Sequence, residues 1–219
     1  MMLLEFARGP AMQIALTVFV FGVCYRLFSL FLLWRTQDSS AGSTRQRPVV
    51  VAAAREIIRR LWPQAAYKQR TLFALINGYI FHLGLAIVVF ALAPHILFFK
   101  DLLGVSWLSL PNNVIYAVAV VTVASMVTSL VLRFALPVLR TISTFDDYFS
   151  WLVTFLPVIT GLIATSHLGA PYETLLAIHL LSVALLLIWL PFGKLMHFVW
   201  VFVTRSQTGV QLSHRGAQL

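Results

Sequence analysis

Long apolar runs alternate with short polar connections along this chain. Runs of about 20 apolar residues are long enough to cross the hydrocarbon core of a bilayer. The pattern predicts an all-α integral membrane protein of five transmembrane helices, forming one domain over residues 1–219. The expected spans are residues 11–34, 73–99, 112–138, 148–167 and 174–203. Composition agrees, since the chain is 60% hydrophobic and 11% charged, against about 25% charged residues in soluble domains.

The basic residues are unevenly distributed among the connections. The connection 35–70 holds eight arginines and lysines, and Arg140, Arg205 and Arg215 lie in or beyond the connections on the same expected side. The alternate connections offer Lys100 beside Asp101, and Glu173. Positive charge gathers on the cytoplasmic side of membrane proteins. We therefore expect an inner (cytoplasmic) membrane protein with its N-terminus outside and its C-terminus cytoplasmic. The net charge of +9 then indicates an anionic lipid surface and no nucleic acid as partner.

The basic cytoplasmic loop 35–70 has two parts. Residues 38–44 are small and polar, which is typical of a flexible linker. Residues 49–62 place apolar residues at helical spacing beside arginines, so we expect an amphipathic helix on the membrane surface. The same helix is also a candidate docking site for a cytoplasmic partner. Asp146 and Asp147 open the fourth span, where carboxylates stabilise a helix start or handle protons near the membrane edge.

Four histidines lie inside apolar stretches and form two pairs by depth. His95 lies near the outer end of the second span and His179 near the outer start of the fifth. His82 and His197 belong to the inner halves of the same two spans. Antiparallel helices would therefore bring His95 level with His179, and His82 level with His197.

The angular positions of these histidines are less uniform than their depths. His179 and His197 are 18 residues apart, about five whole turns, which predicts that they share one face of a continuous fifth helix. His82 and His95 are 13 residues apart and about 140° out of register on a straight helix. Pro94 distorts a helix and redirects the residue that follows it.

A histidine in lipid needs a partner, and a metal ion is among the best available. We therefore expect His82, His95, His179 and His197 to be axial ligands of two stacked haem irons, in the pairs His82–His197 and His95–His179. Bis-histidine ligation fills both axial positions, which favours electron transfer over binding of oxygen or substrate. The single cysteine, Cys24, excludes an intramolecular disulfide and a cysteine-ligated cluster.

Other residues are candidates for supporting roles. Arg26, Arg70 and Lys194 lie near the inner edge, where they would neutralise haem propionates or extend toward the interface. His167, at the outer end of the fourth span, would hydrogen-bond a quinone carbonyl, or would be a loop histidine without such a role. It is also the alternative outer ligand should His95 point away.

A membrane transporter or channel with a histidine proton relay is the alternative function, and a haem-free scaffold is a third. The transporter predicts polar residues facing an interior cavity on the third and fourth spans. The candidates there are Thr122, Ser125, Thr128, Ser129 and Arg133.

Two sequence segments resemble the respiratory nitrate reductase gamma-subunit family. Leu176-Ala-Ile-His179 followed by Leu187-Ile-Trp-Leu-Pro-Phe-Gly-Lys-Leu-Met-His197 is similar to its last helix, and Phe81-His-Leu-Gly84 is similar to its second. The spacing on the second helix is longer than in the nitrate reductase branch. The chain is therefore closer to the cytochrome b subunits of sulfite-reduction-associated and heterodisulfide-reductase-like complexes.

The resemblance implies a dihaem b-type cytochrome subunit of a membrane-bound oxidoreductase. Such a subunit holds two haem b groups. It exchanges electrons between a quinone or quinol pool and a cytoplasmic iron–sulfur or catalytic subunit, which carries the terminal reaction. Both quinol oxidation and quinone reduction are compatible with this sequence.

Overall fold

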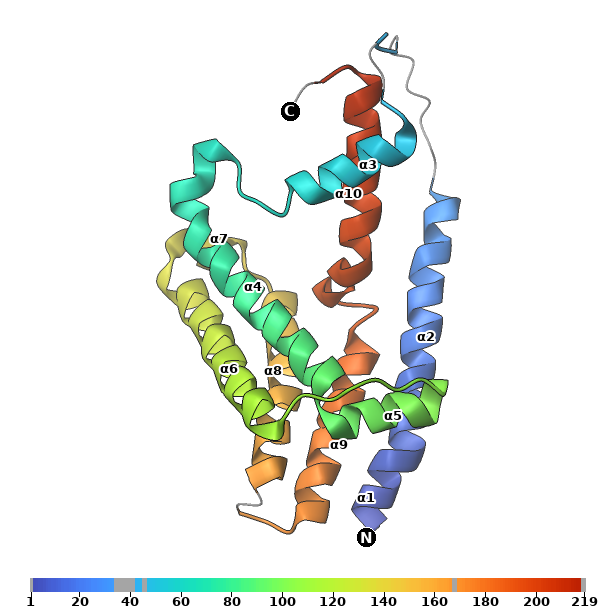
Figure 1. Ribbon diagram of the computed structural model, residues 1–219, viewed down its shortest axis with the longest axis vertical. Helices are drawn as coiled ribbons and strands as arrows, with labels where there is room; N and C mark the ends of the chain where they lie inside the picture. The colour runs from blue at the N-terminus through green and yellow to red at the C-terminus, as the bar shows by residue number, and fades with distance from the viewer. Residues whose placement is uncertain (1, 34–41, 45–46, 167–168, 218–219) are drawn as a thin grey trace.

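The computed structural model describes residues 2–33, 42–44, 47–166 and 169–217. Every regular element in these ranges is a helix. Five helical segments there are long and apolar enough to cross a membrane, which confirms the predicted number of spans. The N-terminus lies at one end of the long axis, and the C-terminus lies toward the other (Figure 1).

The first span is one helical rod with a change of pitch. It comprises α1 (Met2–Phe6), a π-helical turn (Ala7–Ala11), α2 (Met12–Phe28) and a 3-10 turn (Ser29–Leu32). Pro10 lies inside the π-helical turn. Because proline has no N–H to donate and its ring needs space, a widened turn accommodates it within the helix. The span therefore begins at Met2, earlier than residue 11 expected from the apolar run.

The second span is interrupted where a continuous helix was expected. A 3-10 turn (Ala65–Tyr67) leads into α4 (Lys68–Ala91), Leu92 adopts an extended conformation, and α5 (Ala93–Leu103) begins directly after it. Pro94 occupies the first turn of α5, where its missing N–H costs nothing. In Figure 1, α5 turns away from α4 and runs across the long axis.

The third and fourth spans are α6 (Asn112–Ala135) and α8 (Phe145–Ser166), joined by the short helix α7 (Pro137–Ile142). Polar side chains fasten α4 to α6. The amide of Asn77 donates to the Ser125 carbonyl at 3.0 Å, and the Ser125 hydroxyl donates to Asn77. Small residues bring the two helices close, since a Cβ on Gly84 would lie 2.1 Å from the Thr122 hydroxyl.

The fifth apolar run forms two helices rather than one. Helix α9 (Tyr172–Trp189) ends before Pro191, a 3-10 turn (Lys194–Met196) follows, and α10 (His197–His214) continues beyond the spans. The prediction of one continuous helix over 174–203 was therefore wrong. The five-turn register between its two histidines fails with it, because Pro191 cannot donate and Gly193 is extended at φ −90° and ψ −177°.

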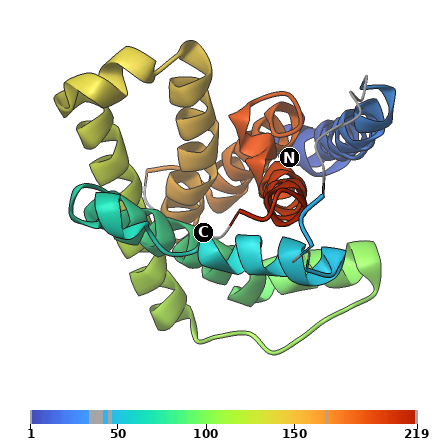
Figure 2. The same cartoon turned by 90° about the horizontal axis from the view of Figure 1, so that it is seen from above.

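The spans pack as a row in the order α4, α6, α8, α9 and α2, and no comparably extensive contact joins α4 to α9 among the described residues. From above, Figure 2 shows α2 and α6 on opposite sides of the molecule with α8 and α9 between them. The second and fifth chain segments therefore meet mainly through groups that project into the space between α4 and α9.

The predicted amphipathic helix of the basic loop is present as α3 (Val49–Arg59), and it packs on α10. Ala52 and Glu56 are buried at this crossing, against Gly209 of α10. A Cβ on Gly209 would lie 2.4 Å from the Ala52 carbonyl oxygen, so the helices cross at backbone contact. The opposite side of α3 exposes Val50 and Ile58.

Candidate functional site

The four histidines of the second and fifth chain segments face one another in two pairs. His82 of α4 lies opposite His197, the first residue of α10, with ring centroids 5.9 Å apart and ring planes at 90°. His95 of α5 lies opposite His179 of α9, with centroids 6.2 Å apart and planes at 16°. We name these the inner and the outer pair. The structure brings together the two pairs that the depths predict, and their role as ligands stays a prediction.

Each ring is held through its Nδ1 atom. His82 donates to the Gly78 carbonyl at 2.7 Å, His95 to the Val88 carbonyl at 2.9 Å, and His197 to the Lys194 carbonyl at 3.0 Å. Because a carbonyl only accepts, these three imidazoles carry their proton on Nδ1 and present the lone pair on Nε2. This is the arrangement that metal-binding histidines adopt.

The fourth ring, His179, has a hydroxyl neighbour. Its Nδ1 lies 3.3 Å from the Thr160 hydroxyl, which in turn lies 3.0 Å from the Ser182 hydroxyl. Gly161 allows the ring to approach α8, since a Cβ there would lie 3.2 Å from Cε1 of His179. A larger residue at this position would therefore displace the ring.

The separation of the rings suits one metal ion between two imidazoles. Metal–nitrogen bonds of about 2.0–2.1 Å and a nitrogen about 1.15 Å from its ring centre place the two centroids roughly 6.3 Å apart. The observed 5.9 and 6.2 Å lie close to this value. Aromatic rings in direct contact have centroids about 4.5–7 Å apart, so these separations fit both a shared metal ion and direct contact.

No cluster of three or more His, Cys, Asp or Glu side chains among the described residues could hold a metal ion. A pair of imidazoles supplies two opposed ligands. A metal held by one pair would therefore need further ligands besides the two imidazoles.

The break in the second span explains how His95 reaches the outer pair. The end of α4 leaves carbonyl groups without helical donors, and other groups use them. The His95 ring donates to the Val88 carbonyl. The Trp107 indole donates to the Phe90 carbonyl, and the Leu110 N–H donates to the Ala91 carbonyl. The turn thus redirects His95 relative to the axis of α4, in the way that Pro94 suggested.

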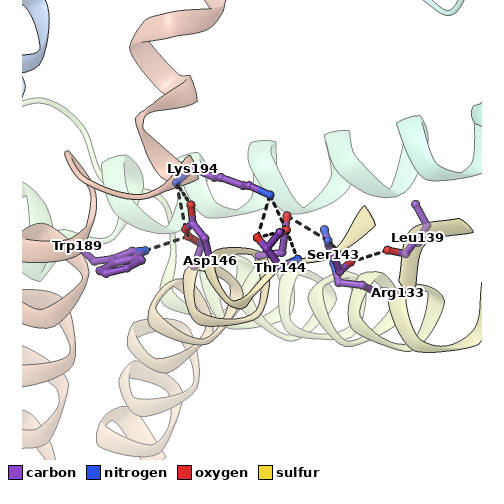
Figure 3. Close-up of polar contacts among 9 residues, drawn as sticks. Arg133, Leu139, Ser143, Thr144, Asp146, Trp189 and Lys194 are labelled. Carbon is purple, nitrogen blue, oxygen red and sulfur yellow. Dashed lines mark hydrogen bonds and ion pairs between the residues drawn. The ribbon is translucent and has the colours of Figure 1, made fainter. Parts of the chain in front are cut away.

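The break in the fifth span is held by the start of α8. Asp146 accepts hydrogen bonds from the Lys194 N–H at 3.0 and 3.2 Å, and from the Ser150 hydroxyl at 2.7 Å (Figure 3). The Trp189 indole donates to the Ser150 hydroxyl at 3.0 Å. From the sequence, Asp146 is expected to be a helix-start or proton-handling residue, and its contact with the fifth span is not predicted. The sequence signal that could have indicated this contact is the expected position of the Asp146 carboxylate, at the same membrane edge as the turn Pro191-Phe-Gly-Lys194.

The basic residues proposed for propionates differ in their surroundings. Among the described side chains that are not exposed, the Arg26 Nε is the one buried nitrogen or oxygen without a hydrogen-bond partner. Arg26 lies over Trp200, with 5.8 Å from Cζ to the ring centroid, and shares with His197 an open hollow of 430 Å³. Lys194 is already paired with Asp147, and Arg70 is exposed at the start of α4.

The polar residues of the third span are used in packing. Ser125 bonds Asn77, while Thr122, Thr128 and Ser129 each donate to a carbonyl of α6 itself. Arg133 binds Ser143 and lies 3.2 Å from Asp147. His167, the candidate quinone ligand and alternative outer ligand, lies outside the described residues.

Fold and site together describe a helical protein with five potential membrane spans and two facing histidine pairs. A protein of Nitratidesulfovibrio vulgaris is 31% identical over 208 residues, which cover 94% of this chain and 91% of that protein. The chain belongs to the family of that protein, whose description states no activity. No family model matches the chain, and no solved structure matches it.

Proposed function

We propose that this chain is a dihaem b-type cytochrome, the membrane subunit of a quinone-linked oxidoreductase. The observation that carries the proposal is the presence of two opposed imidazole pairs. Their centroid separations, 5.9 and 6.2 Å, each suit one iron. The resemblance of its second and fifth spans to the nitrate reductase gamma-subunit family supports the same function.

Haem with two imidazole ligands accepts and releases single electrons at its iron and has no open coordination position. The protein's contribution is to hold both imidazoles of each pair at a fixed separation. The hydrogen bonds from Nδ1 to the backbone fix ring and tautomer, and they raise the basicity of Nε2. These bonds hold three of the four rings, and the fourth, His179, has the Thr160 hydroxyl beside its Nδ1.

Arg26 is the residue best suited to a propionate at the inner pair. Its buried Nε lacks a partner among the described residues, and it lines the same hollow as His197. A guanidinium in this position offers charge-assisted hydrogen bonds to a carboxylate. Lys194 contributes less in this role because its ammonium group is bound to Asp147 and to Thr144.

The inner end would meet the cytoplasmic partner. The basic helix α3 and the C-terminal helix α10 pack together there, and the positive-inside rule supports a cytoplasmic location for both. We propose an iron–sulfur or catalytic subunit as this partner, with quinone or quinol near the outer pair and His167. Electrons would cross the bilayer through the two pairs in either direction.

The transporter alternative lacks an equivalent observation. It requires polar side chains that face a cavity between the third and fourth spans. The hydroxyl groups of the candidates on α6, Thr122, Ser125, Thr128 and Ser129, are bound within α6 or to Asn77 of α4. Arg133 is bound to Ser143 and to Asp147 at the start of α8.

The test is the spectrum and haem content of the purified full-length chain. We expect a reduced-minus-oxidised difference spectrum of a b-type cytochrome and two non-covalently bound haems per chain. Addition of quinol should reduce part of this haem. His214→Ala is the matched control, because this histidine lies in the last turn of α10, away from both pairs, and we expect two haems to remain.

A colourless chain that folds normally would overturn the proposal and favour the transporter. A single haem per chain would contradict the proposal that each of the two pairs holds a haem. Reduction by a soluble donor without any reduction by quinol would leave a cytochrome but remove the link to quinone.

A further inference from the structure

We infer that Asp146 positions the inner ligand His197 through the backbone of Lys194. This inference rests on the proposed function. Asp146 neither contacts the inner pair nor belongs to the helix of either of its histidines. The contacts join the start of α8 to the first residue of α10 in two steps.

The first step is the contact between Asp146 and the turn. Both carboxylate oxygens of Asp146 accept from the Lys194 N–H, at 3.2 and 3.0 Å. This N–H begins the 3-10 turn Lys194–Met196, directly after the extended Gly193. A negatively charged acceptor fits there, since the first N–H groups of a helical turn lack internal partners. Figure 3 shows the carboxylate below the Lys194 backbone.

The second step lies on the other side of the same residue. The Lys194 carbonyl accepts from Nδ1 of His197 at 3.0 Å. The position of Lys194 therefore decides the rotation of the imidazole and directs Nε2 toward His82. Without the carboxylate, the turn after Gly193 has no other acceptor for the Lys194 N–H among the described contacts.

Asp146 is itself held in place by α8 and α9. The Ser150 hydroxyl donates to it at 2.7 Å and receives the Trp189 indole N–H at 3.0 Å. Trp189 is the last residue of α9, so these bonds fix the carboxylate relative to both sides of the break. Asp146 therefore acts on His197 through the position of the Lys194 backbone.

Asp147 provides the contrast. Its carboxylate binds the Lys194 ammonium group and lies 3.2 Å from Arg133, whereas Asp146 binds the Lys194 backbone. The neighbouring carboxylates thus hold different parts of one residue. Asp147→Asn removes a charge beside Lys194 and keeps an amide oxygen that accepts from Thr144, while Asp146 and its bonds to the Lys194 N–H are unaltered.

The experiment compares Asp146→Asn, Asp146→Ala and Asp147→Asn with the wild type as full-length purified chains. The measurements are haem per chain, electron paramagnetic resonance of each oxidised haem, and the midpoint potential of each. Loss of a supporting hydrogen bond behind a ligating histidine typically weakens metal binding about 10- to 100-fold. For Asp146→Ala we expect loss or high-spin conversion of the inner haem with an unchanged outer haem.

For Asp146→Asn we expect both haems to remain and the inner resonance to shift. Asp147→Asn should leave the inner resonance at its wild-type position. Equal changes in the two asparagine variants would assign the effect to local charge and overturn the inference. Loss of both haems in both Asp146 variants, or an unchanged inner haem in Asp146→Ala, would also overturn it. A wild-type chain without haem would overturn the proposed function itself.

Discussion

The inner and outer histidine pairs are assembled in opposite ways from the same two segments of the chain. In the inner pair, the second segment supplies His82 from within α4, and the fifth supplies His197 from beyond its break. In the outer pair, the fifth supplies His179 from within α9, and the second supplies His95 from beyond its break. The two pairs therefore have similar centroid separations but different angles between their ring planes. This makes the two pairs chemically inequivalent.

The breaks are also stabilised by different means. The turn before His95 uses hydrogen bonds from Trp107 and Leu110, which follow α5 in the sequence. The turn before His197 uses the Asp146 carboxylate from a neighbouring span. Changes near the fourth span's inner end should therefore affect one pair and spare the other. The following predictions test this separation.

The largest expected effect is the selective loss of one haem on removal of a ligand. His82→Ala and His197→Ala should each remove the inner haem, because one imidazole cannot replace the pair. His95→Ala and His179→Ala should each remove the outer haem. Haem content should fall from two to one per chain in every case, measured together with the potential of the haem that remains. Identical residual spectra in all four variants would contradict the separation into pairs.

A smaller effect is expected at the break of the fifth span. A Cβ on Gly193 would lie 2.3 Å from the Trp189 indole nitrogen and 3.0 Å from the Asp146 carboxylate. Gly193→Ala should therefore displace the turn and lower inner-haem content, while the outer haem stays at one per chain. Gly9→Ala is the control, since nothing lies within 4 Å of a Cβ at that glycine. Equal loss of both haems would show that the turn supports the whole bundle instead.

The ring angles predict a difference between the resonances of the two oxidised haems. Parallel imidazole planes act on the same iron orbital and separate two otherwise similar levels, whereas perpendicular planes act on both equally. The outer pair at 16° should give a rhombic low-spin signal, and the inner pair at 90° a signal of larger anisotropy. The His179→Ala variant, which loses the outer haem, should keep only the signal of larger anisotropy from the inner haem. Two signals of the same type would contradict the geometry.

The smallest effect concerns pH at the inner end. A hydrogen bond from Arg59, assisted by Arg60 and opposed by burial, holds the pKa of Glu56 below its ordinary value of 4.5. Because both arginines belong to α3, the carboxylate stabilises that helix fully above pH 4.5, and the contribution is lost as pH falls through the lower folded pKa. Hydrogen exchange of α3 should increase on acidification below that value. Glu56→Gln should exchange faster at neutral pH and vary less with acidification.

The sequence predicted the spans well because apolar length is a property of each segment alone. It also predicted which histidines meet, since depth follows from distance to the charged residues at each membrane edge. It failed on the continuity of the fifth helix, where Pro191 and Gly193 outweigh the apolar pattern. The role of Asp146 depends on contacts across 48 positions, between helices whose relative placement no local pattern specifies.

The close crossing of α3 and α10 has a practical consequence. The Ser43 N–H donates to the His214 carbonyl, and Gly209 lies against Ala52, so the basic loop and the C-terminal helix form one composite platform. A peptide copied from either segment would carry half of that platform. A bulky fusion placed soon after residue 217 should therefore disturb the contact between Ser43 and His214.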